Sequence, residues 1–249
     1  MTIEEYAKEV DLQDQLQQQY FKTRDRNVLQ QSKAQERKVR QLTREILNHN
    51  LYNKHYSDIN NWNELRDRAY QTAKAHGFHK GDESVEHYLC LVVTELAEAV
   101  EADRKRKRAN IYRYQVESVT PQAPDHVEKH KDFCFEAFIK DTLEDELADA
   151  TIRLLDLAGM IELDLSLMPS MVRLCDEQTD LSDYQSATFT EHIYNILREL
   201  VKLKTDDAIL CSLGSICALA GYMEIDLAKH IELKMEYNNR RIHKHGKQY

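Results

Sequence analysis

Two stretches of the chain repeat one nine-residue pattern, LAGMIELDL at residues 157–165 and LAGYMEIDL at residues 219–227. Six of the nine positions are identical at an offset of 62 residues, and the shared positions include a Gly, a Glu and an Asp in the same order. Apolar periodicity makes many amphipathic helices look alike, but it does not preserve those three residue types. The repeat therefore indicates an internal duplication.

A second helix is predicted upstream of each copy. The segment ELAEAV at residues 95–100 aligns loosely with ILRELV at residues 196–201. Both halves, about 84–165 and 188–239, then consist of a helix, a connection and a second helix. Two such pairs related by a pseudo-twofold axis make a four-helix bundle. The predicted fold is all-α, with this bundle as an internal pseudo-dimer and an N-terminal helical extension.

The composition supports long helices with few turns. The 249 residues include only 6 Gly and 3 Pro, the residues that most often form tight turns. Glycine-rich phosphate loops and dinucleotide-binding turns are absent from the sequence. Apolar spacing predicts helices over 60–75, 84–106, 135–163, 190–203, 206–222 and from about 226 onward. Pro121, Pro124 and many polar residues predict a loop or excursion over 107–133.

Residues 1–55 are predicted to form an extension separate from the domain at 56–249. Apolar residues recur in it at roughly helical spacing: Val28, Leu29, Val39, Leu42 and Ile46. One narrow stripe is typical of a helix that packs on a partner or forms a short coiled coil, so it offers a route to a homo-oligomer. A partly ordered, solvated extension is the alternative.

Charge and cysteine content limit the partners and the compartment. The formal net charge of −9 argues against a general nucleic-acid binder, whose affinity depends on Lys and Arg. Five cysteines, an odd number, indicate free thiols in a reducing cytoplasm rather than a disulfide framework. No signal peptide opens the chain, and the longest uncharged run, at 208–223, is short for a membrane span. We therefore expect a cytoplasmic protein with no membrane partner.

Two pairs of carboxylates carry the chemistry that the sequence suggests. Glu95 and Glu98 are three residues apart on one predicted helix, and Glu146 and Asp149 are three apart on the next. Each pair shares a helix face whose other members are apolar: Leu91, Val92 and Ala99 for the first, and Leu147, Ala150 and Leu154 for the second. Acids that face a bundle interior repel one another unless a cation lies between them. Four oxygen ligands favour Mg²⁺ or Mn²⁺, although ordinary surface acids are the simpler alternative. A di-iron site would need Glu-x-x-His pairs, which the chain lacks.

These motifs together resemble a known family. The segments TELAEAVEA at 94–102 and EDELADA at 144–150 are similar to the E-x-x-E and E-x-x-D signature of MazG-like nucleoside triphosphate pyrophosphohydrolases, all-α enzymes related to the dimeric dUTPases. The lead-in AKAHGF at 73–78 and the closing stretch KMEYNNRR at 234–241, followed by KHGK at 244–247, add to the resemblance. It covers about residues 60–249, with interruptions.

The resemblance implies an activity and a set of site residues. It implies Mg²⁺-dependent hydrolysis of a nucleoside triphosphate to a monophosphate and pyrophosphate. Glu95, Glu98, Glu146 and Asp149 would hold the metal and form the catalytic set, with one carboxylate orienting or deprotonating water. Lys234, Asn238 and Arg241 would contact the substrate phosphates.

The sequence departs from the family pattern in one informative way. At the 62-residue offset, Glu146, Asp149 and Asp156 correspond to Ala208, Cys211 and Ala218. Conversely, Lys234 and Asn238 correspond to Val172 and Asp176. The two copies have therefore decayed in complementary ways, which predicts one composite site per chain. Two alternatives stay open: a non-catalytic helical scaffold, and a pyrophosphohydrolase of the phosphoribosyl-ATP type.

Overall fold

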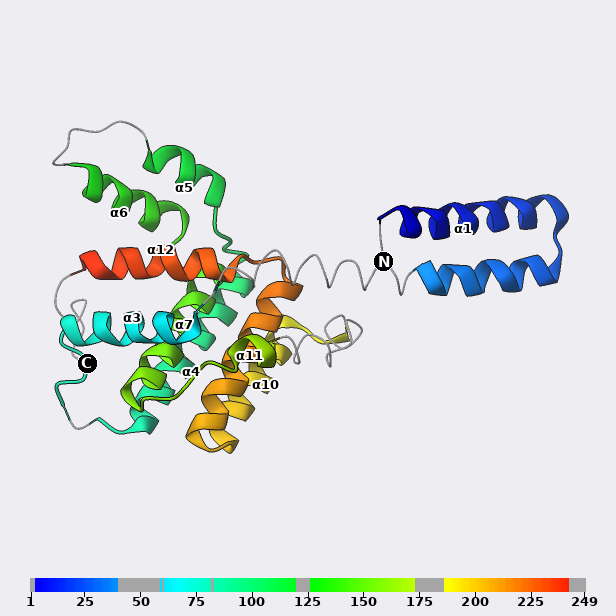
Figure 1. The fold of residues 1–249 in the computed structure, drawn as a ribbon. Helices are drawn as coiled ribbons and strands as arrows, with labels where there is room; N and C mark the ends of the chain where they lie inside the picture. The colour runs from blue at the N-terminus through cyan, green and yellow to red at the C-terminus, as the bar shows by residue number, and fades with distance from the viewer. Residues whose placement is uncertain are drawn as a thin grey trace. The chain divides into compact units, whose positions relative to one another are not determined.

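The computed structural model describes residues 3–39, 59, 61–81, 83–119, 126–172 and 186–241. Within these ranges the chain forms helices and no strand, which confirms the all-α class (Figure 1). It divides into two compact units, Met1–Lys54 and His55–Tyr249.

The N-terminal unit is a hairpin of α1 (Ile3–Thr23) and a helical stretch over residues 26–39. Arg24 makes the turn with a φ of 56°, and its backbone N–H donates to the Tyr20 carbonyl at 2.7 Å. Glu9 joins the two helices, because it accepts from the Gln35 side chain at 2.7 Å and pairs with Lys38 at 2.8 Å. The buried positions of the second helix follow coiled-coil spacing but are half polar: Val28, Ser32, Gln35 and Val39.

Part of the predicted apolar stripe lies in this hairpin. Val28 and Val39 are buried there and Leu29 is half-buried. Leu42 and Ile46 lie outside the described residues. Oligomerisation through this stripe stays a prediction.

The second unit is built around α7, against which four other helices pack. Its helices are α3 (Trp62–Ala75), α4 (Val85–Arg104), α5 (Ile111–Ser118), α6 (Val127–Phe138), α7 (Leu143–Met160), α10 (Phe189–Lys202), α11 (Thr205–Tyr222) and α12 (Leu227–Arg240). Helix α4 packs along α7 and α10 packs along α11, while α4 also contacts α10 and α7 contacts α11. Helices α3 and α12 pack on α7 and on each other. One apolar core joins all six of these helices.

Local capping sets where several helices begin and end. The side chains of Asn61, Thr142, Thr188 and Asp226 each accept a hydrogen bond from the backbone N–H three residues on, as N-cap residues do. Gly77, with a φ of 88°, follows the end of α3 at Ala75, which agrees with the helix predicted over 60–75.

The single helix predicted over 135–163 is wrong. The structure has two helices there, because the chain turns between Phe138 and Leu143. Asp141 adopts a φ of 55°, and the Thr142 hydroxyl accepts from the Asp145 N–H to start α7. The apolar spacing continues through the break, but the N-cap at Thr142 makes α7 begin as a separate helix.

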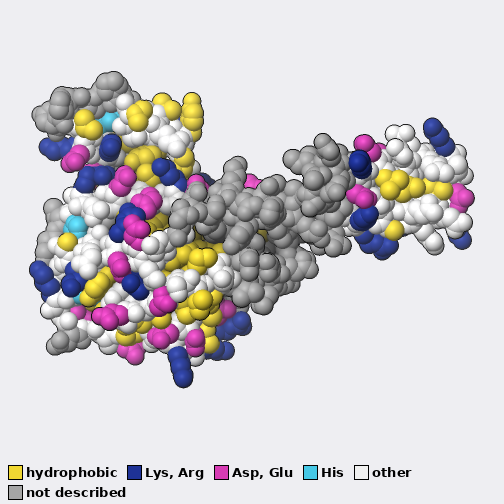
Figure 2. All heavy atoms as spheres, viewed as in Figure 1, with side chains coloured by type: hydrophobic (Ala, Val, Ile, Leu, Met, Phe, Trp, Pro, Cys, Tyr) yellow, Lys and Arg dark blue, Asp and Glu magenta, His cyan; other side chains and the backbone are white. Residues whose placement is uncertain are grey.

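The stretch 107–133, predicted as a loop or excursion, contains α5 and the first half of α6, which pack together. This hairpin docks on α12, where the Phe135 ring stacks on Tyr237 at a centroid distance of 4.4 Å. Tyr112, Val116 and Val119 are exposed in this hairpin at helical spacing. Figure 2 shows hydrophobic side chains, in yellow, over the region of α5 and α6.

The nine-residue repeat has the same local geometry in both copies. Helices α7 and α11 are displaced by 62 residues at both ends, since 143–160 becomes 205–222. Glu162 and Glu224 follow them with φ values of 54° and 58°. Each helix end is closed by a matching backbone hydrogen bond, from residue 163 to residue 158 at 2.9 Å and from residue 225 to residue 220 at 2.8 Å. Helices α3 and α4 end in a similar way, so the shared residues rather than this geometry argue for duplication.

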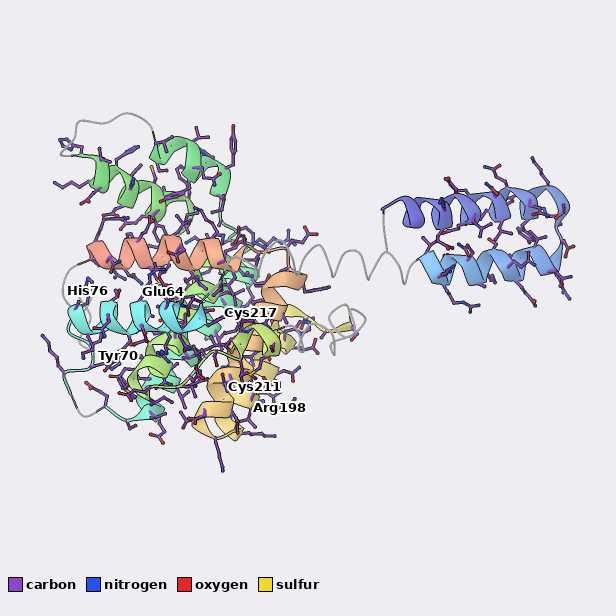
Figure 3. All side chains as sticks on the ribbon, viewed as in Figure 1. Glu64, Tyr70, His76, Arg198, Cys211 and Cys217 are labelled. Carbon is purple, nitrogen blue, oxygen red and sulfur yellow. The ribbon has the colours of Figure 1, made fainter. Side chains whose placement is uncertain are left out.

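Gly159 in the first copy lets α3 approach α7 closely. A Cβ at this position would lie 2.5 Å from the Cβ of Tyr70, which Figure 3 labels. We expect Gly159→Ala to lower the free energy of unfolding by about 1–3 kcal/mol, because α3 must move. The change would do so despite the helix propensity of Ala, which favours it by about 1 kcal/mol.

Urea unfolding measures this effect. Ala97→Gly, at an exposed position of α4, serves as the control for helix propensity alone. Unchanged or increased stability of Gly159→Ala would contradict the close approach.

The described cysteines are all free thiols: Cys90, Cys134, Cys211 and Cys217, the last two labelled on α11 in Figure 3. Cys175 lies outside the described residues. Among the helices described, none is by itself long and apolar enough to cross a membrane, and only the sharply bent pair of α11 and α12, at 114°, has that composition when taken together.

Candidate functional site

Three carboxylates from α4 and α7 meet where these helices pack together. Glu95 points from the buried face of α4, and Glu146 and Asp149 lie one turn apart on α7. Each offers an oxygen, and the three oxygens lie within 4.8 Å of one another. Glu95 and Glu146 are almost fully buried, with 5% and 3% of their surface exposed. The packing of α4 on α7 thus brings together three of the four carboxylates that the sequence singled out.

Glu98, the fourth predicted carboxylate, lies apart from this group. Its side chain is exposed on α4, one turn beyond Glu95. Its negative charge still reaches the site, since it is one of the charges that raise the pKa of Glu146.

The site holds more negative charge than its neighbours compensate. Burial, followed by the charges of Asp145 and Asp149, raises the pKa of Glu146 to about 9. The Lys234 ammonium opposes this shift without cancelling it. Three clustered oxygens with uncompensated charge fit a hard divalent cation such as Mg²⁺ or Mn²⁺, which would supply the missing positive charge.

This charge excess makes the stability of the metal-free protein depend on pH. A carboxyl whose pKa is higher in the folded state binds its proton more tightly there, so folding loses stability as the pH rises from the unfolded value toward the folded one. Asp145, whose pKa burial raises to about 6, acts in the same direction. In EDTA we therefore expect the free energy of unfolding to fall by about 2 kcal/mol between pH 5 and pH 9.

Urea unfolding at pH 5, 7 and 9, with EDTA or with excess Mg²⁺, checks this dependence. Mg²⁺ should stabilise the protein more at pH 9 than at pH 5, because the carboxyls are then ionised. Metal-free stability that is flat or rises over this range would contradict the charge excess.

Asp145 is a site residue that the sequence interpretation missed. It is fully buried, and its Oδ2 accepts from the Asp141 N–H at 3.0 Å and from Lys234 Nζ at 2.8 Å. Its Oδ1 is buried and has no partner among the described residues. The signal in the sequence was the third acid in the run Glu144 to Glu146, which lies next to the N-cap of α7.

Lys234 comes from α12 and binds two carboxylates of α7 at once. Its Nζ lies 2.8 Å from an oxygen of Asp145 and 2.8 Å from one of Asp149. Burial alone would lower the pKa of Lys234, but Asp149 and Asp145 together raise it. Two of the three N–H donors of the ammonium are thus directed at these carboxylates, and the Lys234 side chain is only 6% exposed.

The α5–α6 hairpin covers Lys234 from the side away from α7. The Phe135 ring lies 5.8 Å from Nζ, and Phe135 stacks on Tyr237. The Tyr237 hydroxyl donates to Glu136 at 2.7 Å, and Arg240 pairs with Asp132 at 2.7 Å. The α5–α6 hairpin therefore helps to bury the cation that neutralises Asp149.

A pocket opens next to Asp149 between α3, α7 and α12, and we call it the α3–α7–α12 pocket. Asp149 belongs both to its wall and to the carboxylate group. Two further predicted residues, Asn238 and Arg241, line it as well. The remaining wall is formed by Ala69, Thr72, Ala73, Phe78, Ile152, Arg153, Asp156 and Met235.

Arg153 connects this pocket to the carboxylates. Its Nε donates to Glu95 at 3.2 Å, and its guanidinium lies 6.0 Å from the Phe78 ring centre. The guanidinium thus holds the Glu95 carboxylate in place, and the Phe78 ring lies next to the guanidinium in the pocket wall.

A buried His–Asp pair closes the far end of the pocket. His79 Nε2 lies 2.6 Å from Asp156 Oδ1, and both side chains are only 6% exposed. The His79 ring stacks on Tyr88 at 4.8 Å and meets the edge of Tyr70 at 5.0 Å. Burial raises the pKa of Asp156, whereas the hydrogen bond from His79 opposes the rise.

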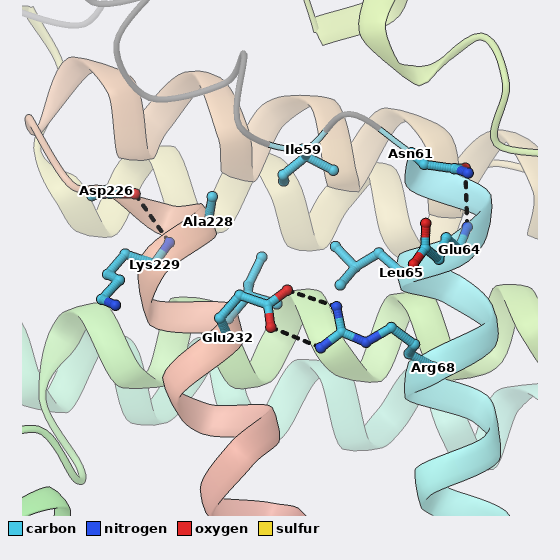
Figure 4. Close-up of a pocket in the computed structure, with 10 residues that line it drawn as sticks. Ile59, Asn61, Glu64, Leu65, Arg68, Asp226, Ala228, Lys229 and Glu232 are labelled. Atoms are coloured by element: carbon cyan, nitrogen blue, oxygen red, sulfur yellow. Dashed lines mark hydrogen bonds and ion pairs between the residues drawn. The ribbon is translucent and has the colours of Figure 1, made fainter.

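A second hollow lies between the first turns of α3 and α12 (Figure 4), away from the carboxylate group. Arg68 and Glu232 form two hydrogen bonds of 2.7 Å across it. Because these two charges satisfy each other at the surface, the hollow offers no clear ligand chemistry.

Three comparisons, with family models, with curated proteins and with solved structures, give no match to this chain.

Proposed function

We propose that this chain is a Mg²⁺-dependent nucleoside triphosphate pyrophosphohydrolase that releases a monophosphate and pyrophosphate. The observation that supports this proposal is the buried group of three carboxylates with excess negative charge, directly beside a pocket lined by Arg153 and Arg241. Such a site can take a divalent cation and a polyphosphate together. The resemblance of the acidic motifs to the MazG-like enzymes supports the same reading.

Glu95, Glu146 and Asp149 would hold Mg²⁺, or Mn²⁺ in its place. The bound ion supplies charge for phosphate oxygens and lowers the pKa of water. Glu98, exposed one turn from Glu95, is the carboxylate that solvent reaches, so it is placed to accept a proton from an attacking water.

Substrate phosphates would be held by cationic and amide groups at the pocket. Arg241 is half-buried on its wall, and Asn238, 8% exposed, has a side-chain NH₂ group that could donate to a phosphate oxygen. Lys234, one turn before Asn238, would act chiefly by fixing Asp149, which it already contacts. The second part of the closing motif, residues 244–247, lies outside the described residues.

We also propose that the core of the second unit is a four-helix bundle derived by duplication, with one composite site per chain. Supporting this, α4–α7 and α10–α11 pack as two pairs that contact each other through α4–α10 and α7–α11. The acids lie on α7, and the equivalent positions of α11 are Ala208 and Cys211. Lys234 and Asn238 come from α12, after the second copy.

Pyrophosphate release from a panel of NTPs and dNTPs with Mg²⁺ tests the activity. We expect turnover that disappears in EDTA, with pyrophosphate rather than orthophosphate as the product. Glu101→Gln, which removes an exposed acid from the same helix as Glu95, should remain active. Absence of turnover in a protein that still binds Mg²⁺ would overturn the enzymatic proposal and favour the scaffold alternative.

A further inference from the structure

Helix α7 presents three charged side chains along one line from the carboxylate group into the pocket. Asp149, Arg153 and Asp156 all line the α3–α7–α12 pocket, at helical positions i, i+4 and i+7. With a rise of 1.5 Å per residue, Asp149 and Asp156 are about 10 Å apart along the helix. That span matches a nucleotide whose phosphates lie near Asp149 and whose base reaches Asp156, with Phe78 beside it.

Two side chains that line this pocket, Asn238 and Asp156, each have an acceptor oxygen to which no described residue donates. Asn238 is 8% exposed, and its Oδ1 has no partner among the described residues. The His79 imidazole occupies Oδ1 of Asp156 and so fixes the carboxylate, while its second oxygen makes no hydrogen bond that the described residues supply. A buried acceptor left without a donor typically costs about 1–3 kcal/mol, so a ligand that brings N–H groups is favoured here.

Resting on the function proposed above, we propose that this pocket receives the nucleobase and selects bases with an exocyclic amino group. Cytosine carries such a group at C4 and brings two N–H donors, one for each acceptor. Uracil carries a carbonyl at the same atom, and its oxygen would face the oxygens of Asp156 and Asn238. Pairs that differ at one hydrogen-bonding position are discriminated strongly when the groups in the pocket are buried.

Comparing dCTP with dUTP tests this selectivity, because the two bases differ only in the group at C4 and in the hydrogen on N3. Uracil thus brings one N–H donor at this edge and a carbonyl oxygen, whereas cytosine brings two donors. We expect kcat/KM for dCTP to exceed that for dUTP by at least about tenfold. In Asp156→Asn one oxygen stays for His79 and an amide NH₂ replaces the free acceptor, so the preference should shift toward dUTP. In Asn238→Leu, which conserves volume, the ratio of kcat/KM for dCTP to that for dUTP should fall about tenfold or more, because any loss of phosphate contacts lowers both values alike.

Binding of dCMP and dUMP, measured by calorimetry without turnover, separates this inference from the proposed activity. Asp67→Asn, an exposed carboxylate of α3 outside the pocket, is the matched control. Hydrolysis of dCTP and dUTP at equal rates would overturn the selectivity and leave the activity standing. Selective binding of dCMP without hydrolysis would support the pocket and overturn the activity. If the protein neither hydrolyses the triphosphates nor binds the monophosphates, the selectivity and the activity are both overturned.

Discussion

Glu146→Gln should abolish Mg²⁺-dependent turnover while leaving the protein folded. Glu146 is 3% exposed and its oxygen lies within 4.8 Å of those of Glu95 and Asp149, so the amide removes one charge from the group that would hold the metal. Mutation of residues that only contact the ligands of a metal typically lowers metal affinity or activity by about 10–100-fold. Loss of a ligand itself should therefore lower kcat/KM by more than about a hundredfold. Mg²⁺ affinity, measured by calorimetry, should fall with it.

The same change should stabilise the metal-free protein, which distinguishes a metal ligand from a merely structural acid. The amide cannot ionise, so it escapes the cost that raises the pKa of Glu146 to about 9. Urea unfolding in EDTA at pH 8 should show the gain, and Glu101→Gln should show neither effect. Turnover near that of the wild type would refute the assignment of Glu146.

Three of the four carboxylates that the sequence singled out lie together in the structure, and helix geometry explains why the fourth does not. Residues three apart on a helix differ by about 60° around its axis, so an i,i+3 pair can straddle the edge of the buried face. The buried residues of α4, which include Val92, Glu95 and Ala99, place Glu95 inside this face and Glu98 at its margin. Spacing alone cannot show which member of such a pair points inward.

The helix break before α7 shows a different limit of sequence interpretation. Phe135, Ile139, Leu143 and Leu147 keep a spacing of four residues through the break, and all four are buried. The periodicity therefore predicts one continuous helix. The capping bond from the Asp145 N–H to Thr142 and the positive φ of Asp141 decide otherwise, and they arise from local polar contacts that an apolar pattern does not record.

The partners of Lys234 could not be predicted, because they lie 89 and 85 residues earlier in the chain. Resemblance suggested a phosphate contact for this lysine, and only the packing of α12 on α7 reveals the carboxylates around it. The fold thus changes the expected consequence of removing the ammonium.

Lys234→Met should lower the free energy of unfolding of the metal-free protein by about 3–5 kcal/mol, the usual cost of removing one partner from a buried ion pair. The change leaves Asp145 and Asp149 facing each other without the cation that lies 2.8 Å from both. Adding Asp145→Asn should restore part of the loss, because one of the two uncompensated charges disappears. Lys229→Met, on the exposed side of α12, should cost little.

Mg²⁺ provides the sharper comparison for Lys234→Met. Without the ammonium, Asp149 is more available to a metal, so the stabilisation by Mg²⁺ in urea unfolding should be larger than in the wild type. A lysine that only contacted phosphate would leave metal-free stability almost unchanged and would raise KM instead. If Lys234→Met keeps wild-type stability in EDTA, with kcat intact and KM raised, Lys234 binds the substrate and does not stabilise the carboxylates.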